Sequence, residues 1–178
     1  MSRHFDDAPG LCEQPDPETQ SYVFNHTMMR IKDPAAALDF YTRVLGMRLL
    51  RRLDFEELNF TLYFLGVVPD AEASAIPADP GERNKATFGR QAVLELTHNW
   101  GSENDPELRF HNGNDSPQGY GHVGFAVPDI HAACKRFEAL GVDFIKRPED
   151  GKIKDIAFIR DPDGYWVEVF EPARMGGL

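Results

Sequence analysis

The sequence predicts an α+β fold built from two βαβββ modules. The main observation is an internal repeat, because the stretches 24–33 and 119–129 share one layout: a β-branched and aromatic run with a histidine near its start and an aspartate at its end. The two histidines, His26 and His122, are 96 positions apart, and the closing aspartates have the same offset. Each stretch is followed by a helical pattern and then by three strand patterns. Such a repeat suggests one site made from two halves.

The first module begins with a strand pattern over Tyr22–Ile31. Asp33 and Pro34 then form a helix start, with the aspartate as N-cap and the proline at the first helical position. Gly46 ends this helix, since glycine adopts the left-handed C′ conformation without strain. The three following strands are expected at Met47–Leu53, Phe60–Leu65 and Ala92–Thr97. Residues 67–90, with three prolines and many small or charged residues, are predicted to form a long insertion.

The second module repeats this order after a polar segment with glycines and prolines. A strand is expected over His122–Val127, and Asp129 precedes a helix over Ile130–Leu140 that Gly141 ends. The last three strands are expected at Val142–Lys146, Ile156–Arg160 and Tyr165–Phe170, with a tight Asp-Pro-Asp-Gly turn before the final one.

These patterns divide the chain into five parts. We expect an N-terminal arm over 1–21, a first module over 22–101 that contains the insertion, a linker over 102–118, a second module over 119–172 and a C-terminal tail over 173–178. The arm is rich in Asp, Glu, Pro and Gln and has no apolar period. Two interpretations of the arm stay open: it wraps a partner subunit, or it is a disordered tail.

Composition excludes several classes of protein. With 178 residues and 42% hydrophobic residues, the chain can bury a sizeable core. A net charge of −10 argues against nucleic acid or an anionic membrane as a partner, because both require clustered Lys and Arg. No apolar run approaches the length of a membrane span, and the start lacks the apolar segment of a signal peptide. Two lone cysteines, Cys12 and Cys134, make no disulfide framework, so we expect a cytoplasmic protein.

Each module also carries a glutamate inside its last strand, Glu95 in the first and Glu168 in the second. A carboxylate between apolar neighbours is costly to bury unless something pairs with it. Either glutamate alone can simply point to solvent, but two at equivalent positions, each matched by a strand histidine, favour a metal site. His26, Glu95, His122 and Glu168 form a mixed nitrogen and oxygen set. That set suits Zn²⁺, Ni²⁺, Co²⁺ or Fe²⁺ rather than Ca²⁺.

Two polar residues accompany the first pair. Arg30 follows His26 by four positions and Asn99 follows Glu95 by four, so each shares a strand face with its ligand candidate if the strand continues. A surface salt bridge is an equally good interpretation of Arg30. The remaining histidines lack a repeat partner and are expected to be surface or loop residues: His4, His98, His111 and His131.

Longer motifs extend these pairs over most of the chain. They are Asp33-Pro with Asp39-Phe-Tyr-Thr-Arg-Val-Leu-Gly-Met47, and the segments 94–101, 110–114, 121–122 and 157–168. Together they resemble the glyoxalase I (lactoylglutathione lyase) family of the vicinal oxygen chelate superfamily. The similarity covers nearly everything from Tyr22 to Pro172. The long arm and the insertion are similar to the longer-chain, usually zinc-dependent branch of that family.

The resemblance implies a homodimer with modules that pair across subunits into eight-stranded curved sheets. Each active site would lie at the interface and hold one divalent metal, with His26 and Glu95 from one chain and His122 and Glu168 from the other. The overall match favours zinc. The longer branch often has Gln at the position of His26, while the nickel-activated branch has His, so nickel or cobalt stays open.

The resemblance also implies glutathione contacts at Arg30, Asn99, Lys146 and Lys152. Gln118 stands where the family offers an arginine, and glutamine cannot make the charge-assisted fork to a carboxylate. Weaker glutathione affinity, or a different thiol, therefore stays open. Apolar residues at the positions of the family's substrate pocket are Leu53, Phe55 and Leu62.

The activity implied is isomerisation of the methylglyoxal–glutathione hemithioacetal to S-D-lactoylglutathione, which detoxifies methylglyoxal. A glutamate would move the proton through a metal-bound enediolate, with Glu168 as principal base and Glu95 as its counterpart. Alternatives are a metal-dependent epimerase or dioxygenase of the same fold, or a non-catalytic protein that binds small molecules.

Overall fold

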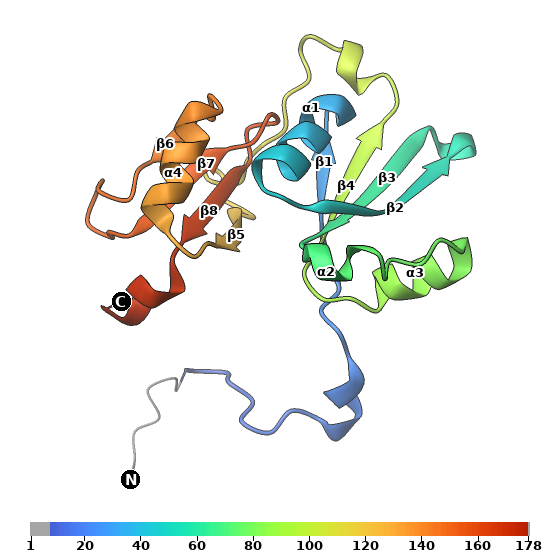
Figure 1. Ribbon diagram of the computed structural model, residues 1–178, viewed down its shortest axis with the longest axis horizontal. Coiled ribbons are helices and arrows are strands. Elements are labelled where there is room, and N and C mark those ends of the chain that lie inside the picture. The colour runs from blue at the N-terminus through green and yellow to red at the C-terminus, as the bar shows by residue number, and fades with distance from the viewer. Residues whose placement is uncertain (1–7, 178) are drawn as a thin grey trace.

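The computed structural model describes residues 8–177 and contains two four-stranded sheets (Figure 1). The first sheet has the order β1-β4-β3-β2 and consists of β1 (His26–Ile31), β2 (Arg48–Phe55), β3 (Phe60–Gly66) and β4 (Val93–Asn99). The second has the order β5-β8-β7-β6 and consists of β5 (His122–Ala126), β6 (Phe144–Lys146), β7 (Ile156–Arg160) and β8 (Trp166–Phe170). In each sheet the first and last strands of the module pair in parallel, and the other neighbours are antiparallel.

The two sheets therefore have the same topology, which confirms an α+β fold of two βαβββ modules. The first sheet lies within 22–101 and the second within 119–172. The five-part division of the chain stays a prediction, as does the pairing of modules across a dimer. His4, predicted to be a surface histidine, lies outside the described residues.

One helix in each module begins at the expected cap. The Asp33 side chain accepts a hydrogen bond from Ala35 N at 2.8 Å, where α1 (Pro34–Asp39) begins, and the chain then continues as a π-helical turn over Phe40–Val44. In the second module, Asp129 caps α4 (Ile130–Ala139) in the same way. The glycines that follow, Gly46 and Gly141, have φ of 74° and 72°, so both adopt the left-handed backbone predicted for them.

Replacing Asp33 with Ala should lower the free energy of unfolding by about 1 kcal/mol, because the amide at the start of α1 loses its acceptor. Asp33→Asn keeps a side-chain oxygen at the cap and should cost much less. Urea unfolding monitored by circular dichroism checks both variants. Equal losses for the two would contradict the role of the cap.

The insertion contains two helices that the sequence analysis did not predict, α2 (Asp70–Ala73) and α3 (Pro80–Phe88). The signal was present, because Asp79 and Pro80 repeat the Asp-Pro helix start of the first module. Arg83 of α3 donates to the backbone carbonyls of Leu49 and Leu50 on β2. Figure 1 shows α2 and α3 together beside the first sheet. The insertion is thus attached to the sheet that carries His26 and Glu95.

One buried apolar cluster extends across both modules and includes Ile31 and Leu96 from the first and Val167 from the second. Polar contacts reinforce this junction. The hydroxyl of Tyr41 donates to Asp161 Oδ2 at 2.8 Å. The guanidinium of Arg136 on α4 donates to two backbone carbonyls at the end of the first helical segment, Val44 O at 2.6 Å and Arg43 O at 2.7 Å. Because these contacts cross the junction, the two sheets form one packed unit.

The described part of the N-terminal arm extends away from this unit (Figure 1). It contains a short 3₁₀ helix, Pro17–Ser21, with no buried residue. Tyr22 and Phe24, which connect the arm to β1, have 76% and 80% of their surface exposed. Within residues 8–177, none of the helices has the length and apolar character needed to cross a membrane.

Candidate metal centre

The first pair of candidate ligands comes from two parallel neighbouring strands, β1 and β4. His26 lies opposite Val93 in the register, and Glu95 is two residues further along β4, so both side chains project from the same face. The Nε2 atom of His26 is 3.0 Å from Oε2 of Glu95. The glutamate side chain is only 13% exposed, while the histidine side chain is 37% exposed. Of the two side chains, the imidazole of His26 is therefore the one more open to solvent.

The second pair has the same construction on β5 and β8. His122 lies opposite Trp166, and Glu168 is again two residues further along. The distance from His122 Nε2 to Glu168 Oε2 is 3.5 Å, and the side chains are 39% and 22% exposed. The repeat in the sequence is thus also a repeat in side-chain geometry.

Both distances fit two ligands of one metal ion. Zinc binds imidazole nitrogen and carboxylate oxygen at about 2.0–2.2 Å, and two such ligands at tetrahedral or right angles are about 2.9–3.5 Å apart. The two nitrogen–oxygen separations, 3.0 Å and 3.5 Å, lie in that interval. The donor set and the geometry of each half therefore suit a divalent transition metal.

Each half contains only two of the four candidate ligands. Within residues 8–177, no three His, Cys, Asp or Glu side chains come close enough to hold a metal together. His26 and Glu95 belong to the first sheet, while His122 and Glu168 belong to the second. A four-ligand centre made from these residues would therefore need halves from two chains, which stays a prediction.

A phenylalanine accompanies each pair, and the sequence analysis did not single it out. Phe64 lies opposite Glu95 in the register, and its ring meets the His26 ring edge-on, with centroids 5.9 Å apart. Phe158 lies opposite Glu168, and its centroid is 5.2 Å from that of His122. The signal was a matching apolar-Phe-apolar triplet in the strand before each glutamate. These rings restrict the orientation of both imidazoles.

The residues predicted to bind glutathione lie in two places. Arg30 on β1 donates to Asn99 Oδ1 on β4 at 2.8 Å, and β4 does continue to Asn99. Both lie on the strand face that carries His26. Lys146 is at the end of β6, where its ammonium donates to the backbone carbonyl of Arg147 at 3.2 Å, and Lys152 is in the exposed loop before β7. The structure therefore brings together the first two but places the lysines on the other module.

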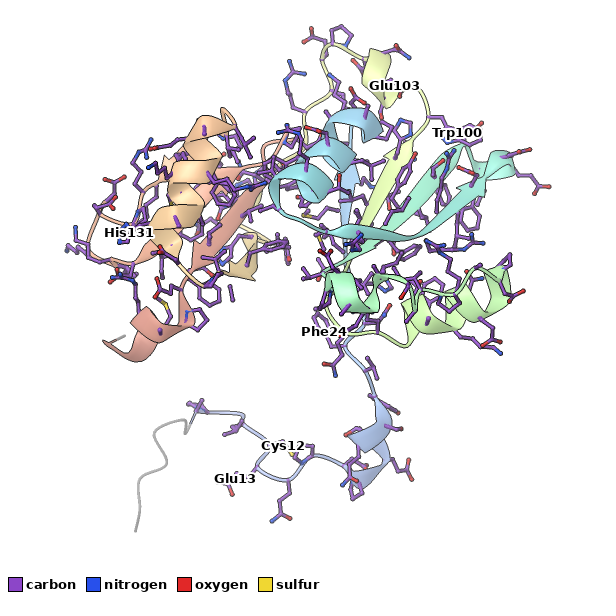
Figure 2. The ribbon with its side chains drawn as sticks, in the orientation of Figure 1. Cys12, Glu13, Phe24, Trp100, Glu103 and His131 are labelled. Carbon is purple, nitrogen blue, oxygen red and sulfur yellow. The ribbon has the colours of Figure 1, made fainter. Side chains whose placement is uncertain are left out.

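The prediction for His98 is wrong. This histidine is on β4 with only 7% of its surface exposed, and its Nε2 is 2.7 Å from Glu103 Oε2. It is a buried hydrogen-bonded side chain rather than a surface or loop residue, because β4 passes under the 3₁₀ turn that carries Glu103. Figure 2 shows Glu103 close to the end of β4.

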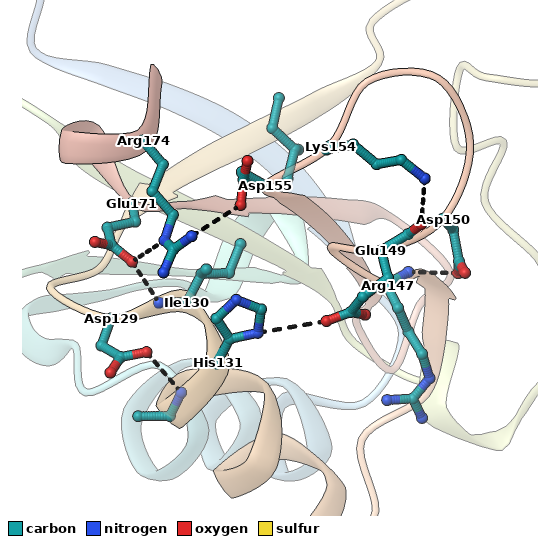
Figure 3. Close-up of polar contacts among 12 residues, drawn as sticks. Asp129, Ile130, His131, Arg147, Glu149, Asp150, Lys154, Asp155, Glu171 and Arg174 are labelled. Atoms are coloured by element: carbon teal, nitrogen blue, oxygen red, sulfur yellow. Dashed lines mark hydrogen bonds and ion pairs between the residues drawn. The ribbon is translucent and has the colours of Figure 1, made fainter. Parts of the chain in front are cut away.

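Two other histidines agree with expectation. His131 is exposed on α4, where its Nδ1 is 3.4 Å from Glu149 (Figure 3), and His111 is in an exposed loop.

The structure does not favour Cys134 as a nucleophile. Cys134 is buried, and burial raises the pKa of its thiol to about 11, which keeps it protonated.

Residues 23–169 match the family described as the Glyoxalase/Bleomycin resistance protein/Dioxygenase superfamily. The chain belongs to this superfamily. Among its relatives, a lactoylglutathione lyase from Pseudomonas aeruginosa is 58% identical over 178 residues, covering 100% of this chain and 98% of the relative. A lactoylglutathione lyase from Pseudomonas putida is 53% identical and covers 94% of this chain and 95% of the relative.

A solved structure of the trypanothione-dependent glyoxalase I of Leishmania major has a TM-score of 0.63 at 30% identity. It covers 87% of this chain and 90% of that one. The superfamily expected from the motifs is therefore confirmed, over the same part of the chain that forms the two sheets.

Proposed function

We propose that this protein is a glyoxalase I, a lactoylglutathione lyase that converts the hemithioacetal of methylglyoxal and glutathione to S-D-lactoylglutathione. The observation that carries the proposal is the pair of matched His–Glu half-sites, at 3.0 Å and 3.5 Å, on two sheets of one topology. Full-length similarity to relatives with this activity supports it.

The proposed metal ligands are His26, Glu95, His122 and Glu168, with one divalent ion for each set of four. Zinc is the favoured ion, and nickel or cobalt would fit the same donors. When bound, the metal supplies Lewis-acid stabilisation of negative charge that develops on substrate oxygens. The half-sites lie on different sheets of one chain, which supports a homodimer with active sites at its interface. The exposed Tyr22 and Phe24 at the base of the arm also suit contact with a second chain.

The two glutamates would carry the proton. Glu168 would accept the proton from C1 of the hemithioacetal and return it to C2, and Glu95 would serve the opposite epimer. Positioned carboxylates of this kind typically contribute a factor of about 10²–10⁴. The apolar rings of Phe64 and Phe158 would keep the reacting centre in a less polar setting, which strengthens its electrostatic interactions.

The glutathione part of the substrate would lie along the strand face that carries Arg30 and Asn99. Their hydrogen bond at 2.8 Å holds the guanidinium in place for a carboxylate. Lys146 and Lys152 would contact glutathione from the other half. Gln118 supplies no charge where the family has an arginine, so we expect weak glutathione affinity or acceptance of another thiol. The two unpaired cysteines, Cys12 and Cys134, support a cytoplasmic setting.

The test is metal removal and replacement. Protein treated with a chelator and dialysed should lose more than 90% of the activity, measured as ultraviolet absorbance of the thioester product, on the order of the loss expected for an essential Lewis acid. Adding Zn²⁺, Ni²⁺, Co²⁺ or Mn²⁺ separately should restore it, most of all with Zn²⁺. No activity with any of the four ions would refute the proposed function.

A further inference from the structure

We propose that Asn25 is a positioning residue that sets the tautomer of His26 as a metal ligand. Through its hydrogen bonds, Asn25 also connects the 67–90 insertion to the proposed metal centre. The inference rests on the proposed function, since it treats His26 as a metal ligand. Asn25 precedes β1 directly and is partly buried. It has no role in the ligand set or in the substrate contacts described above.

The orientation of the Asn25 amide is determined by its neighbours. Its Nδ2 atom donates to two backbone carbonyls at the end of the insertion, Thr87 O at 3.0 Å and Arg90 O at 2.6 Å. Carbonyl oxygens only accept, so the nitrogen of the amide must face them. The Oδ1 atom therefore faces the other way, where it lies 2.7 Å from Nδ1 of His26.

This arrangement determines which imidazole nitrogen carries the proton. The Oδ1 of an amide is only an acceptor, so Nδ1 of His26 must donate to it. With a metal bound, the neutral imidazole has one proton, and the lone pair is left on Nε2, the atom that faces Glu95 at 3.0 Å. A metal ligand needs this lone pair. Partners of this kind on the far ring nitrogen orient metal-binding histidines and raise their basicity.

A second contact from the insertion reaches the same imidazole. Phe88, the last residue of α3, meets Phe64 edge-on with centroids 5.0 Å apart, and Phe64 meets His26. The insertion thus approaches His26 through a hydrogen bond on one side and through an aromatic ring on the other. Both contacts come from the C-terminal end of α3, so α3 stabilises the position of the His26 side chain.

The other half of the site has no equivalent of the amide. The residue before His122 is Gly121, which has no side chain to offer. Asn114 instead donates to the backbone carbonyl of Gly121 at 2.7 Å. The two histidines are therefore supported differently, and the loss of Asn25 should affect only the first.

The test compares Asn25→Ala with Asn84→Ala. Asn84 is also in the insertion and accepts from Arg51 at 2.7 Å, so its loss weakens the packing of α3 without removing a partner of His26. The first readout is the exchange rate of the Nδ1 proton of His26 in Zn²⁺-saturated protein, measured by NMR. In the wild type and Asn84→Ala the Asn25 oxygen should hold this proton and slow its exchange, while in Asn25→Ala the proton should exchange much faster with solvent. The second readout is Zn²⁺ affinity by competition with a chromophoric chelator.

Asn25→Ala should bind Zn²⁺ about 10–100-fold more weakly than the wild type, the range usual for loss of such a partner. Asn84→Ala should stay within about twofold, far below that range. If Asn25→Ala kept slow exchange of the Nδ1 proton and the wild-type affinity, the positioning role would be wrong, although the proposed function would stand. A wild-type protein that binds no divalent metal would overturn the proposed function and this role with it.

Discussion

Glu168→Gln should lower kcat by a factor of about 10²–10⁴, because the amide cannot accept the substrate proton. The glutamine oxygen can still reach the position of the carboxylate, since the two side chains have the same length. Glu168 is on β8 and 22% exposed, so the substitution buries no new group. We therefore expect a folded protein with nearly unchanged thermal stability.

The matched control is Glu82→Gln, which makes the same chemical change on the exposed surface of α3. It should keep the wild-type kcat. Steady-state kinetics at saturating Zn²⁺, with the metal content measured for each variant, separates loss of the base from loss of the ion. Near-wild-type turnover of Glu168→Gln with metal bound would remove Glu168 from the proton-transfer step.

The second large effect is a dependence of the free energy of unfolding on pH, caused by Asp161 at the junction between the modules. Asp161 is 4% exposed, and burial raises the pKa of its carboxyl from 3.8 to about 6. The folded protein thus holds this proton more tightly than the unfolded chain. The resulting stabilisation is fully present below about pH 4 and is lost as the pH rises through about 6. A shift of about two units corresponds to up to about 3 kcal/mol in the free energy of unfolding.

Asp161→Asn should remove this dependence. The asparagine oxygen can still accept from the backbone N–H groups of Asp163 and Tyr165, and its amide can face Tyr41. The stability of the variant relative to the wild type should therefore rise by up to about 3 kcal/mol between pH 4 and pH 7. Burial also raises the pKa of Asp163, and the charge of Asp163 adds to the raised pKa of Asp161 in the wild type.

Denaturant unfolding at several pH values provides the measurement. Asp39→Asn is a useful control, since the hydrogen bond from Arg43 lowers the pKa of the Asp39 carboxyl. Its contribution has the opposite sign, present above the unfolded pKa and lost as the pH falls. Parallel stability curves for Asp161→Asn and the wild type would contradict the prediction.

Patterns within short segments were enough to predict most of the secondary structure. Asp33 and Asp129 cap their helices as expected, and β7 has the predicted bounds, Ile156–Arg160. The four ligand candidates were also identified in this way, because the repeat compares each module with the other. Caps and strand alternation depend on neighbours a few residues away, so the sequence contains the whole of that information.

Other features depend on segments that are distant in sequence. The amide of Asn25 donates to acceptors more than 60 positions away, at Thr87 and Arg90. No local sequence pattern predicts hydrogen bonds between such distant residues. His98 was misjudged because its burial depends on the turn that follows β4. The sequence by itself thus determined which residues are candidate metal ligands. Only the tertiary structure decided how each imidazole is held, because hydrogen bonds and packing across the fold orient a side chain.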